Sequence, residues 1–119
     1  MTGAIDYSRE ALSDAMADVL LRLRQRAPRV HCLTNAVAQA FTANVLLALG
    51  AIPSMTLAAE EVPAFAASAD ALLLNLGTLD DTRRTAFALG LEVAEREGKP
   101  WVLDPVFVDR SPPRLALAG

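Results

Sequence analysis

Short apolar runs alternate along this chain with longer segments of helical periodicity, and this alternation limits the possible folds more than any other feature. The runs that predict buried strands are 30–33, 51–55, 71–76 and 101–103. The segments that predict helices are 9–26, 35–49, a short one with Pro63 in its first turn, 80–97 and the start of one at 114–119. Strands that alternate with helices form parallel sheets with right-handed crossovers. The sequence therefore predicts an α/β fold with a mainly parallel sheet flanked by helices.

Local signals indicate the ends and the buried faces of these elements. The apolar stripe of the first helix consists of Leu12, Met16, Val19, Leu20 and Leu23. Thr34-Asn35 offers N-cap side chains to the second helix, Gly50 is its expected stop, and Asp80-Asp81 suits a helix N-terminus. Apolar and small residues surround the second helix, so we expect it to be buried on most sides. The continuous run 71–76 predicts a parallel strand covered on both faces.

The composition bounds the class of protein. The 119 residues amount to one domain, and a hydrophobic share of 53% supplies ample material for a core. The net charge of −3 argues against nucleic acid as the main partner, because that partner normally requires a basic patch. One cysteine excludes an internal disulfide and a multi-cysteine zinc site. The first ten residues contain charges and no apolar signal segment, so we expect a cytoplasmic protein.

One stretch resembles a membrane segment in lacking charge. No charged residue occurs from Cys32 to Ala59, but polar residues are scattered through this stretch, and Gly50 and Pro53 interrupt it. A spanning helix needs about 20 continuous, predominantly apolar residues. The pattern therefore predicts a buried helix followed by a buried strand, and no membrane partner.

Small or polar side chains follow the predicted strands. They are Thr34-Asn35, Asn75 with Gly77-Thr78, and Asp104-Pro105, while Met55 ends the remaining run. Ligands of open parallel sheets bind at the carboxyl ends of the strands, which makes this edge the candidate site. The same residue types are also common in turns and caps, so both interpretations stay open. Asp104 is the most informative acid, because a carboxylate there either holds Mg²⁺ near phosphates or caps a turn.

Other candidate groups are better interpreted as structural. His31 and Cys32 are adjacent in a predicted strand, so their side chains point to opposite faces and form no catalytic dyad. We expect Cys32 in the core, Glu60-Glu61 at a helix start and Arg83-Arg84 on a solvated helix face. The chain contains no phosphate-loop, dinucleotide-binding or HExxH motif. Pattern alone thus predicts an α/β domain with a ligand crevice and leaves the reaction open.

A set of short segments adds a resemblance to a known family. In chain order these segments are 31–35 (HCLTN), 42–51 (TANVLLALGA), 53–55 (PSM), 60–62 (EEV), 74–79 (LNLGTL) and 103–106 (LDPV). In this order and spacing they resemble the N-terminal half of the hydroxyethylthiazole kinase family, which belongs to the ribokinase-like superfamily. The resemblance covers roughly residues 28–106.

The resemblance implies a reaction and a set of site residues. It implies phosphorylation of the hydroxyl of 4-methyl-5-(2-hydroxyethyl)thiazole by ATP with Mg²⁺ in thiamine biosynthesis and salvage. It also implies a homotrimer with active sites between subunits. Matched to the family's motifs, Asn35, Val37 and Met55 line the thiazole pocket, and Asp104 lies near Mg²⁺ and the phosphates. A Met thioether and a Val methyl suit a flat, sulfur-containing ring.

The resemblance also defines what we do not expect from these residues. The family's nucleotide-binding residues and its catalytic cysteine belong to a second half. We therefore interpret 1–119 as the N-terminal part of a ribokinase-like domain, with no catalytic residue in this chain and no activity alone. The family usually continues after Asp-Pro-Val with a glycine-rich turn, where this chain has Phe107-Val108-Asp109-Arg110-Ser111; Arg110 could supply positive charge there.

Two alternative functions stay open at this stage. One is a non-catalytic module that binds a small heterocycle or assembles with a partner. The other is a different ribokinase-like enzyme, such as a nicotinamide-nucleotide-hydrate dehydratase. A cysteine in a glycine-rich motif beyond Gly119 would favour the kinase, and a stop codon there would favour the module.

Overall fold

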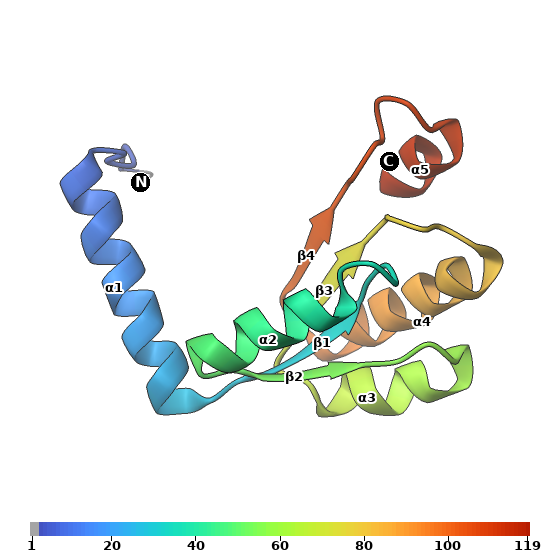
Figure 1. The fold of residues 1–119 in the computed structure, drawn as a ribbon, viewed down its shortest axis with the longest axis horizontal. Coiled ribbons are helices and arrows are strands. Elements are labelled where there is room, and N and C mark those ends of the chain that lie inside the picture. Colours follow the sequence, from blue (N-terminus) through green and yellow to red (C-terminus); the bar gives the residue numbers. More distant parts are fainter. Residues whose placement is uncertain (1–2) are drawn as a thin grey trace.

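The predicted strands pair into one parallel sheet (Figure 1). The computed structural model describes residues 3–119. Its elements are α1 (Arg9–Arg26), β1 (Arg29–Leu33), α2 (Gln39–Leu49), β2 (Ile52–Met55), the short 3₁₀ helix η1 (Ala59–Glu61), α3 (Val62–Ser68), β3 (Ala71–Asn75), α4 (Asp81–Glu97), β4 (Trp101–Asp104) and α5 (Pro112–Ala118). The α/β class with a parallel sheet and flanking helices is confirmed.

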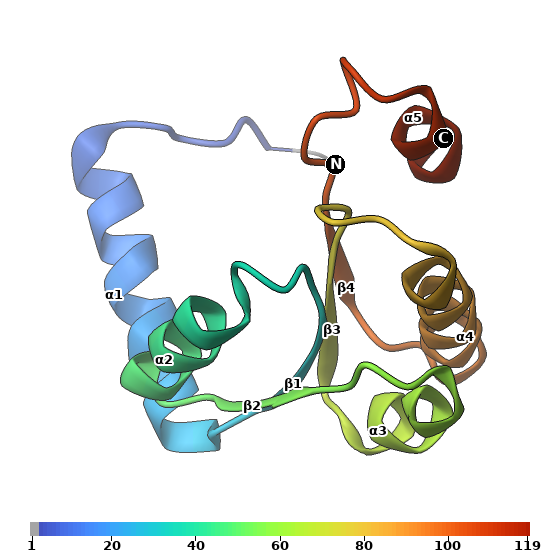
Figure 2. The ribbon, with the colours of Figure 1, turned by 45° about the vertical axis from the view of Figure 1, so that its right-hand side comes forward.

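The order of the strands in space differs from their order in the chain. The sheet runs β2-β1-β3-β4, and Figure 2 shows α1 and α2 on one side of it and α3 and α4 on the other. From β1 the chain first moves outward through α2 to β2 and then crosses back through α3 to β3. The direction of winding therefore reverses between β1 and β3. In open parallel sheets such a reversal creates a crevice at the carboxyl ends of the two strands.

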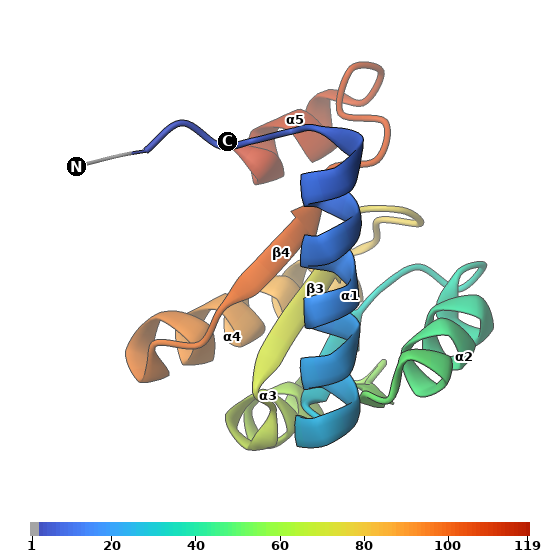
Figure 3. The same ribbon diagram turned by 90° about the vertical axis from the view of Figure 1, so that its left-hand side faces the viewer.

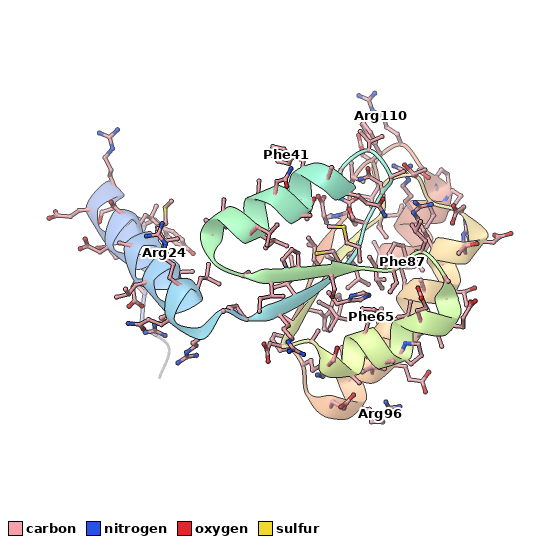
Figure 4. The ribbon with its side chains drawn as sticks, turned by 60° about the horizontal axis from the view of Figure 1, so that its bottom comes forward. Arg24, Phe41, Phe65, Phe87, Arg96 and Arg110 are labelled. Atoms are coloured by element: carbon pink, nitrogen blue, oxygen red, sulfur yellow. The ribbon has the colours of Figure 1, made fainter. Side chains whose placement is uncertain are left out.

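The core lies between the sheet and the α3 and α4 side. Leu33, Leu72, Leu74 and Phe87 are buried there, and each fully buried side chain of this kind stabilises the fold by about 1.5–3 kcal/mol. Figure 4 shows Phe65 and Phe87 on this side of the sheet. Gly90 lets α4 approach β1, because a Cβ at this position would lie 2.9 Å from Cδ1 of Leu33.

The opposite side of the sheet is only partly covered, which corrects two predictions. Both α1 and α2 lie within the described residues 3–119, and neither helix contains a buried residue. The predicted burial of α2 on most sides is therefore wrong. In β3, Leu72 and Leu74 are buried while Ala71, Leu73 and Asn75 are only half-buried, so this strand is not covered on both faces. Figure 1 shows the reason: α1 projects away from the sheet, and Figure 3, viewed from the α1 side, shows it as the outermost helix there. Its apolar stripe lines an open groove with Leu49.

The helix ends follow local capping rules with one shift. Asp80 accepts a hydrogen bond from the backbone of Arg83 at the start of α4, and Gly50 ends α2 with a φ of 96°. The second helix begins at Gln39 rather than at 35, because Asn35 caps the preceding turn instead: its Oδ1 accepts from the backbone N–H of Ala38 at 2.8 Å. Within residues 3–119, no helix is long and apolar enough to cross a membrane.

Candidate functional site

Three polar side chains meet at the carboxyl edge of the sheet, beside the reversal in strand order between β1 and β3. Asn35 follows β1, Asn75 ends β3 and Asp104 ends β4. Asn75 and Asp104 are register partners in neighbouring parallel strands, so their side chains leave the sheet on the same face. Sequence reasoning placed Asn75 at a strand end without assigning it a role, because pairing between strands is not visible in a local pattern.

Hydrogen bonds join these three residues into a chain that we name the amide relay (Asn35, Asn75 and Asp104). Nδ2 of Asn35 donates to Oδ1 of Asn75 at 2.8 Å. Nδ2 of Asn75 in turn donates to Oδ2 of Asp104 at 2.9 Å. The backbone N–H of Gly77 donates to the same Oδ1 of Asn75 at 2.9 Å. The relay therefore connects the ends of three strands, β1, β3 and β4.

Asp104 supplies a carboxylate that has no ion-pair partner among residues 3–119. It is exposed, and no lysine or arginine of residues 3–119 lies within ion-pair distance of it. Within the same residues, no group of three or more His, Cys, Asp or Glu is arranged to hold a metal ion. Mg²⁺ is commonly held by one or two carboxylates together with water and substrate phosphates. A single exposed carboxylate fits that mode and does not form a closed metal cage.

The other predicted site residues lie at the same edge but outside the amide relay. Met55 ends β2 and is half-buried. It is the register partner of Cys32, so it lies on the same face of the sheet as Cys32, towards α2. Val37 lies in the turn before α2 and is 91% exposed.

A separate cavity of about 250 Å³ opens on the α4 side of this edge, lined by residues that include Thr34, Thr56, Arg83 and Phe87. The prediction that Arg83 belongs to a solvated face is wrong: its side chain is 16% exposed. It ion-pairs with Asp80 at 2.6 Å, and its Nε donates to the carbonyl of Thr34 at 3.3 Å. The backbone N–H and the charge of Arg83 lower the pKa of Asp80. Arg83 thus fastens α4 to the end of β1.

The pair His31 and Cys32 has the structural role that was predicted. His31 is fully buried, and its ring nitrogens hydrogen-bond Ser54 Oγ at 2.8 Å and Thr56 Oγ1 at 3.0 Å. Phe65 stacks on the imidazole, and burial lowers the pKa of His31. Cys32 is buried on the other face, where burial raises its pKa to about 11. A thiol with this pKa is unsuited to nucleophilic catalysis at neutral pH.

The turn after β4, residues 105–111, contains no glycine. Phe107 nevertheless has a φ of 58°, which lies in the left-handed region that favours glycine. The backbone thus takes a glycine-like conformation with a phenylalanine in it. Arg110, the residue considered as a source of charge, is exposed and pairs with Asp109 at 3.5 Å; Figure 4 shows it at the outer end of this turn.

Fold and site together define a class of protein: a parallel α/β domain with a group of polar side chains at the carboxyl edge, next to the reversal in strand order. A sequence profile of the hydroxyethylthiazole kinase family matches residues 20–118. The chain belongs to this family.

Individual relatives agree with the family assignment. A relative from Agrobacterium fabrum is 54% identical over 102 residues, and the hydroxyethylthiazole kinase of Cronobacter sakazakii is 55% identical over 92 residues. These matches cover 86% and 77% of this chain. A solved structure of the hydroxyethylthiazole kinase protein from Pyrococcus horikoshii OT3 aligns with a TM-score of 0.84 and 42% identity over 88% of this chain. The chain spans only 42% and 35% of the two relatives and 41% of the solved chain.

Proposed function

We propose that this chain supplies the thiazole and metal side of a hydroxyethylthiazole kinase. The reaction is transfer of the γ-phosphoryl group of ATP to the hydroxyl of 4-methyl-5-(2-hydroxyethyl)thiazole, in thiamine biosynthesis and salvage. The observation that carries the proposal is the amide relay, which joins Asn35 to Asp104 along the carboxyl edge of the sheet in a chain of this family. Both residues were assigned to the site from the sequence alone.

Asn35, Val37 and Met55 form the proposed thiazole-binding group. Asn35 follows β1, Met55 ends the neighbouring strand β2 at the same edge, and the thioether of Met55 supplies an adaptable apolar contact for a flat ring. The exposure of Val37 supports a pocket that is completed by atoms from outside this chain. A homotrimer with sites between subunits provides such atoms, and we propose that assembly for the enzyme in the cytoplasm.

Asp104 is the proposed Mg²⁺ residue. When bound, Mg²⁺ neutralises charge on the phosphates during phosphoryl transfer, where positioning and electrostatic stabilisation supply most of the catalysis. Asp104 offers a carboxylate on the same face as Asn75, with no lysine or arginine paired to it in the described part of the chain. Asp104 ends β4 and Asn35 follows β1, with β3 between them. The metal would therefore lie apart from the proposed alcohol site, while the amide relay still connects the two residues.

The remaining groups of the reaction have no counterpart in these residues. Cys32 is buried with a raised pKa and does not stand in for the family's catalytic cysteine. The matched part is 35–42% of the compared relatives. We therefore propose that nucleotide-binding and catalytic residues come from polypeptide outside 1–119, and that the 119-residue chain alone binds MgATP weakly and has no kinase activity.

Separate binding measurements test this proposal. Calorimetry with the 119-residue chain should detect the thiazole alcohol and little or no MgATP. Met55→Ala should weaken alcohol binding by about 1–3 kcal/mol through lost apolar contact. Ala40→Gly, on the exposed face of α2, serves as a control that leaves alcohol binding unchanged. Absence of alcohol binding, or thiazole-dependent ADP formation by the purified chain, would contradict the proposal.

Kinetics separate the roles within the enzyme that contains this chain. Asp104→Asn should lower kcat by about tenfold or more, because the lost charge acts on the moving phosphate, and should leave the KM for the alcohol nearly unchanged. Met55→Ala should raise that KM more than it lowers kcat. If Asp104 only caps a turn, asparagine will replace it and turnover will survive.

A further inference from the structure

We propose that Asn75 is the positioning residue of this site: it holds the Asp104 carboxylate by one oxygen and leaves the other oxygen free for a divalent cation. This inference rests on the proposed function, because it gives the Asp104 carboxylate a cation to bind. It adds a residue with no assigned role, and it follows from hydrogen-bond polarity, sheet register and the space around Gly77.

The hydrogen-bond partners fix the orientation of each amide. Oδ1 of Asn35 accepts from the backbone N–H of Ala38, so its Nδ2 must face Asn75. Oδ1 of Asn75 accepts from both Asn35 and the backbone N–H of Gly77. Turning the Asn75 amide over would place its NH₂ against two donors and its oxygen against a carboxylate. Nδ2 of Asn75 therefore always faces Asp104.

The carboxylate of Asp104 is consequently held at one end only. Oδ2 accepts from Asn75 at 2.9 Å, and no hydrogen bond from residues 3–119 reaches Oδ1. Asn75 and Asp104 are also register partners at the ends of β3 and β4, which fixes the distance between their backbones. A hydrogen-bonded carboxylate with one free oxygen suits a cation that otherwise keeps water and phosphate ligands.

Gly77 provides the space that this arrangement needs. A Cβ there would lie 2.8 Å from Nδ2 of Asn35 and 2.9 Å from Oδ1 of Asn75. The close approach of the two amides thus depends on a residue without a side chain. Asn75 is the central member of the relay, and it couples the proposed alcohol-binding residue to the proposed metal residue.

The test compares cation affinity with stability in the full chain. Mn²⁺ is titrated alone and followed by electron paramagnetic resonance, which counts free Mn²⁺, and Asp104→Asn defines the background. Asn75→Leu keeps the volume and removes all three side-chain hydrogen bonds of Asn75, and should weaken Mn²⁺ binding roughly 10–100-fold. Asn44→Leu removes an amide from the exposed face of α2 and should leave Mn²⁺ binding within twofold of the original, on the order of assay error.

A reversed pair separates positioning from mere structural support. In Asn75→Asp with Asp104→Asn, the new carboxylate accepts from Asn35, Gly77 and the new amide, so the melting temperature should recover relative to Asn75→Leu. Mn²⁺ binding should not recover, because each oxygen of the new carboxylate then accepts a hydrogen bond and neither is left free for the cation. Recovery of Mn²⁺ binding in the reversed pair, or unchanged binding in Asn75→Leu, would overturn the inference.

The outcomes also distinguish this inference from the proposed function. Mn²⁺ binding that depends on Asp104 and Asn75, in a chain that does not bind the thiazole alcohol, would contradict the proposed function and support the positioning role. Alcohol binding without any Asp104-dependent Mn²⁺ binding would support the proposed function and overturn the positioning role.

Discussion

The guanidinium of Arg114 lies over the ring of Phe107, 5.9 Å from the ring centroid. Its Nη1 also donates to the carbonyl of Val106 at 3.2 Å, so α5 is tied to the turn that follows β4. Phe107 has the left-handed φ of 58°. The contact between Arg114 and Phe107 therefore stabilises the turn, whereas the left-handed backbone conformation of Phe107 strains it.

Replacing Phe107 by glycine is expected to change stability little. Glycine relieves strain of about 1–3 kcal/mol, which offsets the loss of an exposed cation–π contact of about 0.5–1 kcal/mol and a glycine entropy cost of about 0.5–1 kcal/mol. The free energy of unfolding in urea should stay within about 1 kcal/mol of the original. Phe107→Val loses the ring and keeps the strain, and should destabilise the chain more than Phe107→Gly does. The reverse order would contradict a strained turn.

Gly77→Ala should damage the amide relay. The added methyl would lie within 3.0 Å of Asn35 and Asn75 atoms, so we expect a loss of about 1–3 kcal/mol in unfolding free energy. Gly3→Ala is the control, because nothing lies within 4 Å of a Cβ there. In an Asn75→Ala background the cost of Gly77→Ala should shrink. An equal cost in both backgrounds would show that the relay is not what the methyl disturbs.

Stability should fall in mild acid because of His31. The chain contains a single histidine, and burial lowers its pKa in the folded state. Below about pH 6.5 the unfolded chain binds a proton that the folded chain does not. The free energy of unfolding should therefore decrease as pH falls from about 7, by at most about 1.4 kcal/mol per pH unit, until the folded pKa is reached.

The variant His31→Gln identifies the source of this pH dependence. Glutamine keeps hydrogen-bonding groups near Ser54 and Thr56 but does not titrate. The variant should be less stable at neutral pH and nearly pH-independent between about 5 and 7. Urea unfolding at several pH values measures both effects. A slope equal to that of the original chain would assign the dependence to other groups.

Cys32 should be almost unreactive in the folded chain. Burial raises its pKa from 9.0 to about 11, which lowers the thiolate fraction about a hundredfold before access is considered. Reaction with a disulfide reagent should be slow in buffer and fast in urea. Ala40→Cys in a Cys32→Ser background places the only thiol on the exposed face of α2 and should react quickly in both. Rapid reaction of Cys32 in buffer would contradict its burial.

The β4 edge of the sheet should promote self-association. β4 lies at one end of the sheet, and Val102 is 64% exposed on it; apolar edges of this kind pair with other chains. Val102→Lys should shift sedimentation towards the monomer, by about tenfold in dissociation constant. Ile5→Lys also replaces an exposed apolar residue by lysine, but outside the helices and strands, and should change the dissociation constant less. A wild-type chain that stays monomeric at high concentration would contradict this prediction.

Local patterns were sufficient for the elements and several of their ends. The apolar runs predicted each strand to within a residue or two, because burial of a strand shows directly in its composition. Capping by Asp80 and the stop at Gly50 also depend only on neighbouring backbone groups. The same logic correctly placed His31 and Cys32 on opposite faces, since side chains alternate along a strand.

Coverage of the faces depended on tertiary structure. The composition of α2 predicted burial, but α1 extends outward and leaves that helix exposed. Arg83 looked like a surface residue, yet it packs against Asp80 and the end of β1. Helical periodicity indicates which face is apolar and does not indicate which element, if any, covers it.

The local pattern alone was enough to place Asn35, Asn75 and Asp104 at the ends of strands, and therefore at one edge of a parallel sheet. The hydrogen bonds between them depend on the packing of the strands. The sheet order places β3 between β1 and β4, and the register sets Asn75 beside Asp104. Strand order and register result from packing between distant segments, so a pattern of neighbouring residues does not contain them.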